Sequence, residues 1–130
     1  MSKTATRLGE INLVTVPVID QDLSIEFYVD KLGFEKRTDV EFGGGKYRWV
    51  EVYPPSGTTG IALAPPPDGK VQARETGISL TTDDADATHA ELRSRGVDVD
   101  AEVSRMGDPV PPMFWFRDPD GHSLMIVEVR

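Results

Sequence analysis

The feature that most constrains the fold is a weak internal repeat. Residues 11–34 read as an apolar strand, an Asp-rich turn and a helix that ends at a glycine, and residues 76–97 repeat this plan. Asp20 recurs as Asp84 and Ser24 as Thr88, so both pairs are separated by the same 64 positions (84 − 20 and 88 − 24). Each copy therefore begins with a strand that leads into a helix, and this repeat sets the architecture.

Both predicted helices have start and stop signals. Asp20 or Asp22 can accept hydrogen bonds from the free N–H groups of the first turn, and Gly33 can take the left-handed conformation that ends the helix. Asp84 and Gly96 have the same roles in the second copy. One face of the first helix carries, at helical spacing, Ser24, Phe27, Tyr28 and Leu32. Each helix should therefore lie on a sheet.

Strand-like segments follow each helix without further helices between them. They cover residues 34–40, 47–53 and 60–64 in the first copy, and 97–103, 113–117 and 123–129 in the second. Because strands follow strands, two such βαβββ modules predict an α+β fold rather than a parallel α/β sheet. The modules span residues 8–65 and 75–130, joined by a proline-rich linker at 65–74 within one domain of residues 1–130.

Composition excludes several classes of function. The chain has 130 residues, a formal net charge of −8 and no cysteine. The acidic balance argues against nucleic acid as a partner and favours a cationic ligand, although acidic residues also simply maintain solubility. Without cysteine, disulfides and thiolate chemistry are excluded. No apolar run can cross a bilayer, and residues 1–7 do not resemble a signal peptide, so we expect a cytoplasmic protein without a membrane partner.

Two motifs resemble a known family. The helix that carries Ser24, Phe27 and Tyr28 and ends in Leu-Gly-Phe, together with the Asp-Pro-Asp-Gly turn at 118–121, is similar to the glyoxalase, bleomycin-resistance and ring-cleaving (extradiol) dioxygenase superfamily, also called vicinal oxygen chelate (VOC) proteins. The resemblance implies two βαβββ modules that form a curved mixed sheet around a cavity. It also implies a homodimer, since in many members the partner chain completes the cavity. Such motifs identify the fold, not the chemistry.

The resemblance also locates the metal site of metal-dependent members, which hold a divalent ion through His or Glu in each module. The corresponding positions in this chain are Leu13, Ala62, Gly77 and Met125. None of them offers an imidazole or a carboxylate. The histidines of the chain, His89 and His122, are expected at surface or turn positions rather than at a metal. We therefore predict no metal and no cofactor.

Strand alternation predicts which side chains line the cavity. Val14, Val16 and Val18 should face a helix. The residues that alternate with them, such as Leu13 and Thr15, should then face the cavity on the opposite side of the sheet. The predicted ligand-binding residues are Leu13, Thr15, Tyr47, Trp49, Glu51, Tyr53, Met113, Trp115 and Met125. Three aromatic side chains around the carboxylate of Glu51 suit a planar or cationic ligand. The same aromatics could instead pack against the other module or a dimer partner.

The leading prediction is a metal-free small-molecule binding protein that resembles the drug-sequestering bleomycin-resistance proteins. The alternative is a glyoxalase-like lyase or isomerase, or a dioxygenase-like oxygenase, with an atypical metal site or with Glu51 as general base. A third possibility is a structural or regulatory module whose cavity is filled by its own side chains, in which case Trp49 and Trp115 belong to the core. No catalytic residue can be named from the sequence.

Overall fold

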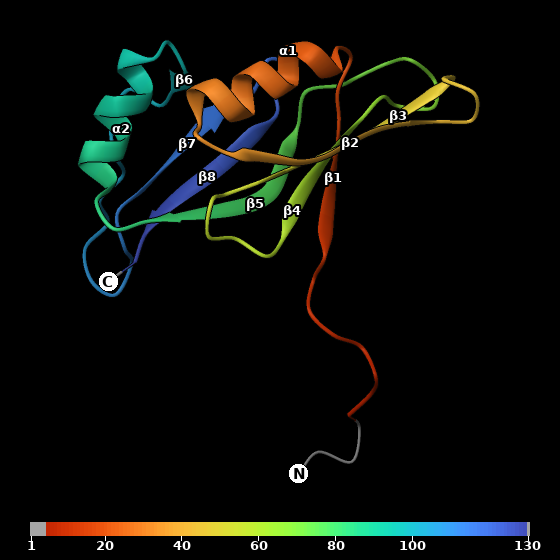
Figure 1. The fold of residues 1–130 in the computed structure, drawn as a ribbon. Coiled ribbons are helices and arrows are strands. Elements are labelled where there is room, and N and C mark those ends of the chain that lie inside the picture. Colours follow the sequence, from red (N-terminus) through yellow and green to blue (C-terminus); the bar gives the residue numbers. More distant parts are fainter. Residues whose placement is uncertain (1–4, 130) are drawn as a thin grey trace.

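The two halves of the chain fold into two four-stranded mixed sheets (Figure 1). The structure is a computed structural model that describes residues 5–129, so residues 1–4 of the N-terminal stretch considered above lie outside the described part. The first sheet has the order β1-β4-β3-β2, with β1 (Leu13–Pro17), β2 (Glu35–Phe42), β3 (Tyr47–Tyr53) and β4 (Gly60–Ala64). The second has the order β5-β8-β7-β6, with β5 (Glu75–Thr82), β6 (Asp98–Val99), β7 (Met113–Arg117) and β8 (Ser123–Glu128).

The sheets confirm the predicted α+β class and its βαβββ plan. In each sheet the first strand runs parallel to the last strand, and the other neighbours are antiparallel. Both sheets are open. One boundary was wrong, because the strand predicted over 97–103 is only the short β6. There the carboxylate of Asp100 accepts hydrogen bonds from the Trp115 backbone N–H and from Arg117, which replaces further strand pairing.

The helices begin and end where their local signals predicted. The first is α1 (Gln21–Ile25), which widens into a π-helical segment, η1 (Glu26–Lys31), and the second is α2 (Ala85–Ser94). Asp20 caps the first helix by accepting a hydrogen bond from the Leu23 N–H at 3.0 Å, and Asp84 caps α2 in the same way. Gly33 ends the first helix with a φ of 80°. Within residues 5–129 no helix is long and apolar enough to cross a membrane.

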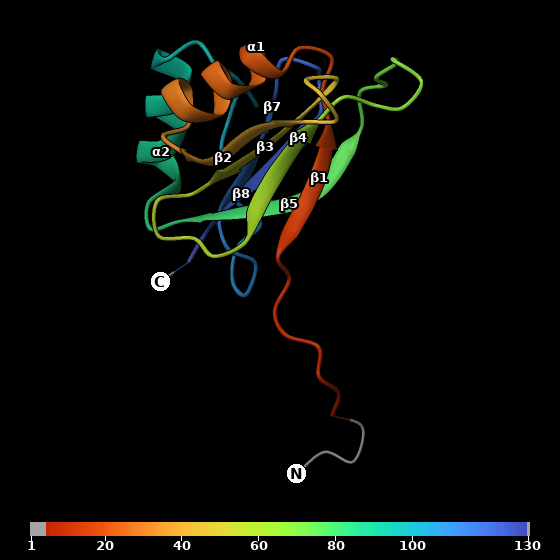
Figure 2. The same ribbon diagram turned by 45° about the vertical axis from the view of Figure 1, so that its right-hand side comes forward.

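Both helices lie on the same side of the molecule, and the two modules share one core there (Figures 1 and 2). Val16 and Val18 are buried in this core, as predicted. The first helix reaches the second module, since the rings of Phe27 and Phe116 lie 6.2 Å apart between centroids. The first helix therefore joins the two sheets, because it contacts β7 as well as its own module.

Both histidines are buried, so a surface position was wrong for them, although His122 does follow the turn at 118–121 as predicted. His89 is 9% exposed, its Nε2 lies 2.6 Å from the carbonyl oxygen of Asp100, and its ring meets Phe114 edge-on. His122 is fully buried, and its Nε2 lies 2.9 Å from the carbonyl oxygen of Pro17. Because both acceptors are backbone groups from distant segments, the local sequence pattern gave no sign of them.

Candidate ligand-binding site

The predicted site residues of the first module share one face of its sheet. Along β3, Val50 and Val52 point into the core, so Trp49, Glu51 and Tyr53 occupy the opposite face. Glu51 pairs with Ala62 of β4, which in turn pairs with Thr15 of β1. A row of side chains therefore crosses the sheet from β1 to β3, with Leu13 on the same face two residues before Thr15.

Glu51 is held between its two aromatic neighbours on β3. The Trp49 Nε1–H donates to Oε2 of Glu51 at 2.7 Å, and the Tyr53 hydroxyl donates to Oε1 at 2.7 Å. The hydrogen bond to this carboxylate raises the pKa of Tyr53 above its ordinary value. We call Trp49, Glu51 and Tyr53 the aromatic–carboxylate cluster. A fixed carboxylate beside aromatic rings can attract a planar cation with little rearrangement.

Two residues that the sequence analysis did not select position Tyr53. The guanidinium carbon of Arg37 lies 4.5 Å from the centre of the Tyr53 ring, and Arg37 also donates to the carbonyl oxygens of Gly57 and Pro55 at 2.7 and 2.9 Å. Gly60 leaves room for the ring, since a Cβ there would lie 2.6 Å from the nearest ring carbon. Nothing in the strand pattern indicates these contacts, because they join residues of different strands and loops.

Replacing Gly60 by alanine is expected to destabilise the fold by about 1–3 kcal/mol, because the added methyl group must displace the Tyr53 ring. Urea denaturation measures this loss. In a Tyr53→Ala background the same substitution should cost little, as a double-mutant cycle would reveal. Gly9→Ala is the matched control, since a Cβ there meets nothing within 4 Å. If Gly60→Ala lowered the free energy of unfolding equally in the native and the Tyr53→Ala backgrounds, the assigned contact between Gly60 and the Tyr53 ring would be contradicted.

The face continues toward the tip of the β2–β3 hairpin. Val40 pairs with Trp49, and Phe42 pairs with Tyr47, whose ring stacks on that of Phe42 at 5.2 Å between centroids. Val40, Phe42 and Tyr47 are each about half exposed. Val40 and Phe42 were not among the predicted site residues, which alternation selected from other strands, although the glycine turn at 43–45 indicates the Phe42–Tyr47 pairing.

The predicted residues of the second module form a separate group. Trp115 pairs with Met125 across β7 and β8, Met113 lies two residues before Trp115, and all three are half-buried. They lie on the second sheet, whereas the aromatic–carboxylate cluster lies on the first. Within one chain the predicted site residues therefore form two separate groups, one on each sheet.

The metal positions implied by the resemblance are divided in the same way. Leu13 and Ala62 lie on the first sheet, and Gly77 and Met125 lie on the second. Over residues 5–129 no group of three or more His, Cys, Asp or Glu side chains could hold a metal ion. These residues do not fit a divalent ion, because aliphatic, glycine and thioether groups are not its ligands.

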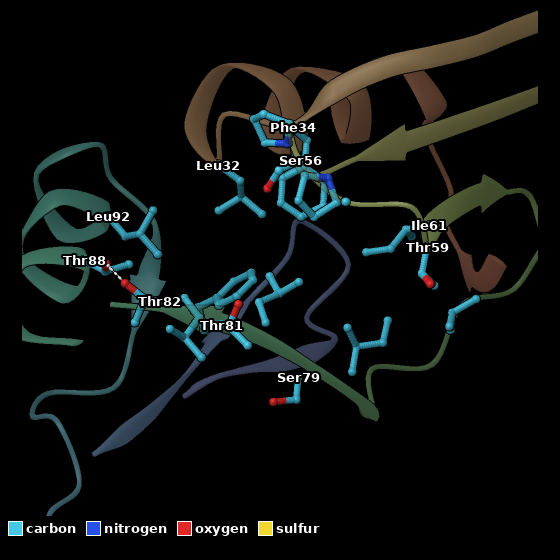
Figure 3. Close-up of a pocket in the computed structure, with 18 of the residues that line it drawn as sticks. Leu32, Phe34, Ser56, Thr59, Ile61, Ser79, Thr81, Thr82, Thr88 and Leu92 are labelled. Carbon is cyan, nitrogen blue, oxygen red and sulfur yellow. Dashed lines mark hydrogen bonds between the residues drawn. The ribbon is translucent and has the colours of Figure 1, made fainter. Parts of the chain in front are cut away.

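A cleft of about 740 Å³ opens between the two modules on the core side of the sheets (Figure 3). It is bordered by the end of the first helix, the β3–β4 loop, β5 and α2. Its apolar residues include Val14, Leu32, Phe34, Ile61, Ile78, Leu80, Leu92, Phe116 and Ile126. None of the predicted site residues lines this cleft. The sequence could not indicate it, because its walls come from both modules.

The comparisons with known proteins agree with this architecture. The model of the Glyoxalase/Bleomycin resistance protein/Dioxygenase superfamily matches residues 10–126. The uncharacterized protein YurT of Bacillus subtilis (strain 168) is 30% identical over 129 residues, covering 92% of this chain and 98% of YurT.

Two solved structures are similar over nearly their whole length. TnmS3, an antibiotic binding protein from Streptomyces sp. CB03234, is 32% identical with a TM-score of 0.81, covering 97% of this chain and 100% of TnmS3. A superfamily member from Sphaerobacter thermophilus DSM 20745 is 35% identical with a TM-score of 0.86, covering 95% of this chain and 100% of that one. The chain therefore belongs to the Glyoxalase/Bleomycin resistance protein/Dioxygenase superfamily.

Proposed function

We propose that this protein is a metal-free small-molecule binding protein that holds a planar cationic compound against the aromatic–carboxylate cluster. The observation that carries the proposal is the carboxylate of Glu51, which is fixed at 2.7 Å by both Trp49 and Tyr53 on the sheet face opposite the core, where Trp49 and Glu51 are half-buried. Trp49 supplies a stacking surface and Glu51 a negative charge. The net charge of −8 attracts cations to the molecule as a whole.

Two further observations support binding rather than catalysis. TnmS3, which shares the fold at 32% identity, is an antibiotic binding protein. Both oxygens of Glu51 already accept hydrogen bonds from neighbouring side chains, which suits a fixed acceptor for a ligand better than a base that must receive a proton. The residues at the metal positions support a metal-free mode of binding.

We further propose that a second copy of the chain completes the site. Val40, Phe42 and Tyr47 are about half exposed beside the cluster, and such a contiguous apolar surface is typical of an interface. The group of Met113, Trp115 and Met125 on the second sheet is the complementary surface that a partner chain would supply, so each chain would contribute half of the ligand site. The ligand would then lie between the first sheet of one protomer and the second sheet of its partner.

Calorimetric titration with a matched pair of compounds tests this function. N-methylacridinium is a planar cation, and acridine in mildly alkaline buffer is its neutral counterpart. Glu51→Gln is expected to weaken N-methylacridinium binding about tenfold, because the variant removes the charge but keeps the side-chain shape. Acridine binding should change by less than about twofold, since stacking does not need that charge.

Glu102→Gln, on an exposed loop of the second module, is the control for the change in net charge. It should leave the binding of both compounds unaltered. An equal loss in the Glu51 and Glu102 variants would mean that only the overall field matters, and would contradict the proposed site. Failure of the native protein to bind either compound would contradict the proposed ligand class.

A further inference from the structure

We infer that the cleft in Figure 3 is a second ligand site, which takes an uncharged apolar molecule with hydrogen-bonding groups along one edge. This inference goes beyond the proposed function, because the ligand chemistry and the location both differ. It rests on the position of the cleft, its apolar floor, its hydroxyl rim and its lack of unpaired charge.

The cleft lies on the opposite face of the first sheet from the aromatic–carboxylate cluster. Val14 and Ile61, which pair across β1 and β4, line the cleft. Their neighbours Thr15 and Ala62 belong to the face of Glu51. Because successive side chains of a strand point to opposite faces, the sheet itself separates the two locations.

The floor of the cleft is the exposed side of the shared core. Phe34, Phe116 and Ile126 are buried core residues that line it, and half-buried Ile78 and Leu80 extend the apolar surface along β5. β5 has only β8 as a neighbour, so the sheet ends there and the cleft opens along its edge. A ligand in this position would remove apolar side chains from water, which is the main source of affinity in small-molecule pockets.

The rim carries hydroxyl groups instead of charges. The hydroxyl-bearing residues of the lining on the core side are Ser56, Thr58, Thr59, Thr82 and Thr88. Ser79 and Thr81 also border the cleft at the edge strand β5, where their side chains alternate toward the face of Met125. Thr82 and Thr88 share a hydrogen bond at 2.7 Å across the gap between β5 and α2, which Figure 3 draws as a dashed line. The single ionisable residue in the lining, Glu91, is paired with Arg95 at 3.1 Å. This lining suits a neutral ligand, because among residues 5–129 it contains no positively charged residue that could bind an anion, and its one carboxylate is already paired with an arginine.

One wall is fixed before any ligand arrives. The β3–β4 loop contributes Pro54 to Thr59 to the lining, and Arg37 donates to the carbonyl oxygens of Pro54, Pro55 and Gly57 in this loop. A volume of about 740 Å³ lies within the range of pockets that hold drug-sized compounds. The cleft is therefore preformed and large enough for a polycyclic molecule.

The probe is N-phenyl-1-naphthylamine, a neutral apolar amine whose fluorescence rises in apolar surroundings. We expect saturable binding of one molecule per chain. Ile78→Gln, which makes the floor polar, and Ser56→Trp, which places a large side chain at the exposed part of the lining, should each weaken binding about tenfold. Ile19→Gln is the matched control, because Ile19 is 58% exposed and lies outside the cleft. Ser56 is exposed in a turn, so its variant keeps the test valid if Ile78→Gln impairs folding.

Competition separates this inference from the proposed function. Equilibrium dialysis of the probe in the presence of saturating N-methylacridinium should give unchanged binding, because the two compounds occupy opposite faces. Displacement of the probe would place it at the aromatic–carboxylate cluster and would overturn the cleft site while leaving the proposed function intact. The inference is also overturned if binding is not saturable, or if Ile78→Gln and Ser56→Trp bind as tightly as the Ile19→Gln control.

Discussion

Replacing Phe116 by alanine is expected to lower the free energy of unfolding by about 3–5 kcal/mol, the usual cost of removing a buried phenylalanine ring. Phe116 is fully buried on β7, and its ring contacts Phe27 of the first helix at 6.2 Å between centroids. The substitution therefore removes a contact that joins the two modules as well as core volume. Urea denaturation followed by circular dichroism measures the change.

The control for this loss is Phe42→Ala on the β2–β3 hairpin. Phe42 is 50% exposed in the single chain and its ring stacks on that of its hairpin neighbour Tyr47, so in the monomer, measured at low protein concentration, its removal should cost less than about 1 kcal/mol. Comparable losses of unfolding free energy in the two variants would contradict the assignment of Phe116 to a shared core. The same result would contradict the conclusion that the first helix joins the two sheets.

Replacing His122 by alanine is expected to cost about 2–4 kcal/mol, although the sequence analysis treated this residue as a turn residue. The imidazole is fully buried, and its Nε2–H donates to the carbonyl oxygen of Pro17 at the end of β1. Alanine would leave both a cavity and an unsatisfied carbonyl group between the modules. The same denaturation experiment measures this loss.

His122→Leu separates packing from hydrogen bonding. Leucine nearly fills the volume, and it also removes Nδ1, which is buried without a hydrogen-bond partner. We therefore expect a loss of only about 1–2 kcal/mol, from the unsatisfied Pro17 carbonyl. If leucine were as costly as alanine, the hydrogen bond rather than the cavity would dominate. If neither variant lost stability, His122 would not join the modules.

Local signals explain why so much of the fold was predictable. The bounds of β3, β4 and β7 agree with the sequence patterns, because each strand lies between strong turn residues and alternates or is continuously apolar. The caps at Asp20 and Asp84 depend only on residues within the same helical turn. The end of β6 was not predictable, because the side chain of Asp100 meets β7, a segment more than ten residues away.

The candidate site, too, was predictable where it depends on a local pattern and not where it depends on contacts between distant segments. Alternation along β3 placed Trp49, Glu51 and Tyr53 on one face, and the hydrogen bonds of the structure join them. Alternation could not identify Arg37, whose contact with Tyr53 depends on the course of the β3–β4 loop. Nor could it predict the cleft, because no single segment of the sequence contains its walls.

The most direct test of small-molecule binding uses the indole N–H signals of the two tryptophans in a ¹H–¹⁵N NMR spectrum. Trp49→Phe assigns the signals of Trp49 and Trp115. The account predicts that N-methylacridinium shifts the Trp49 signal in a saturable manner, because the compound stacks beside an N–H that donates to Glu51. A Trp49 signal that stays in place while the compound binds would contradict the account.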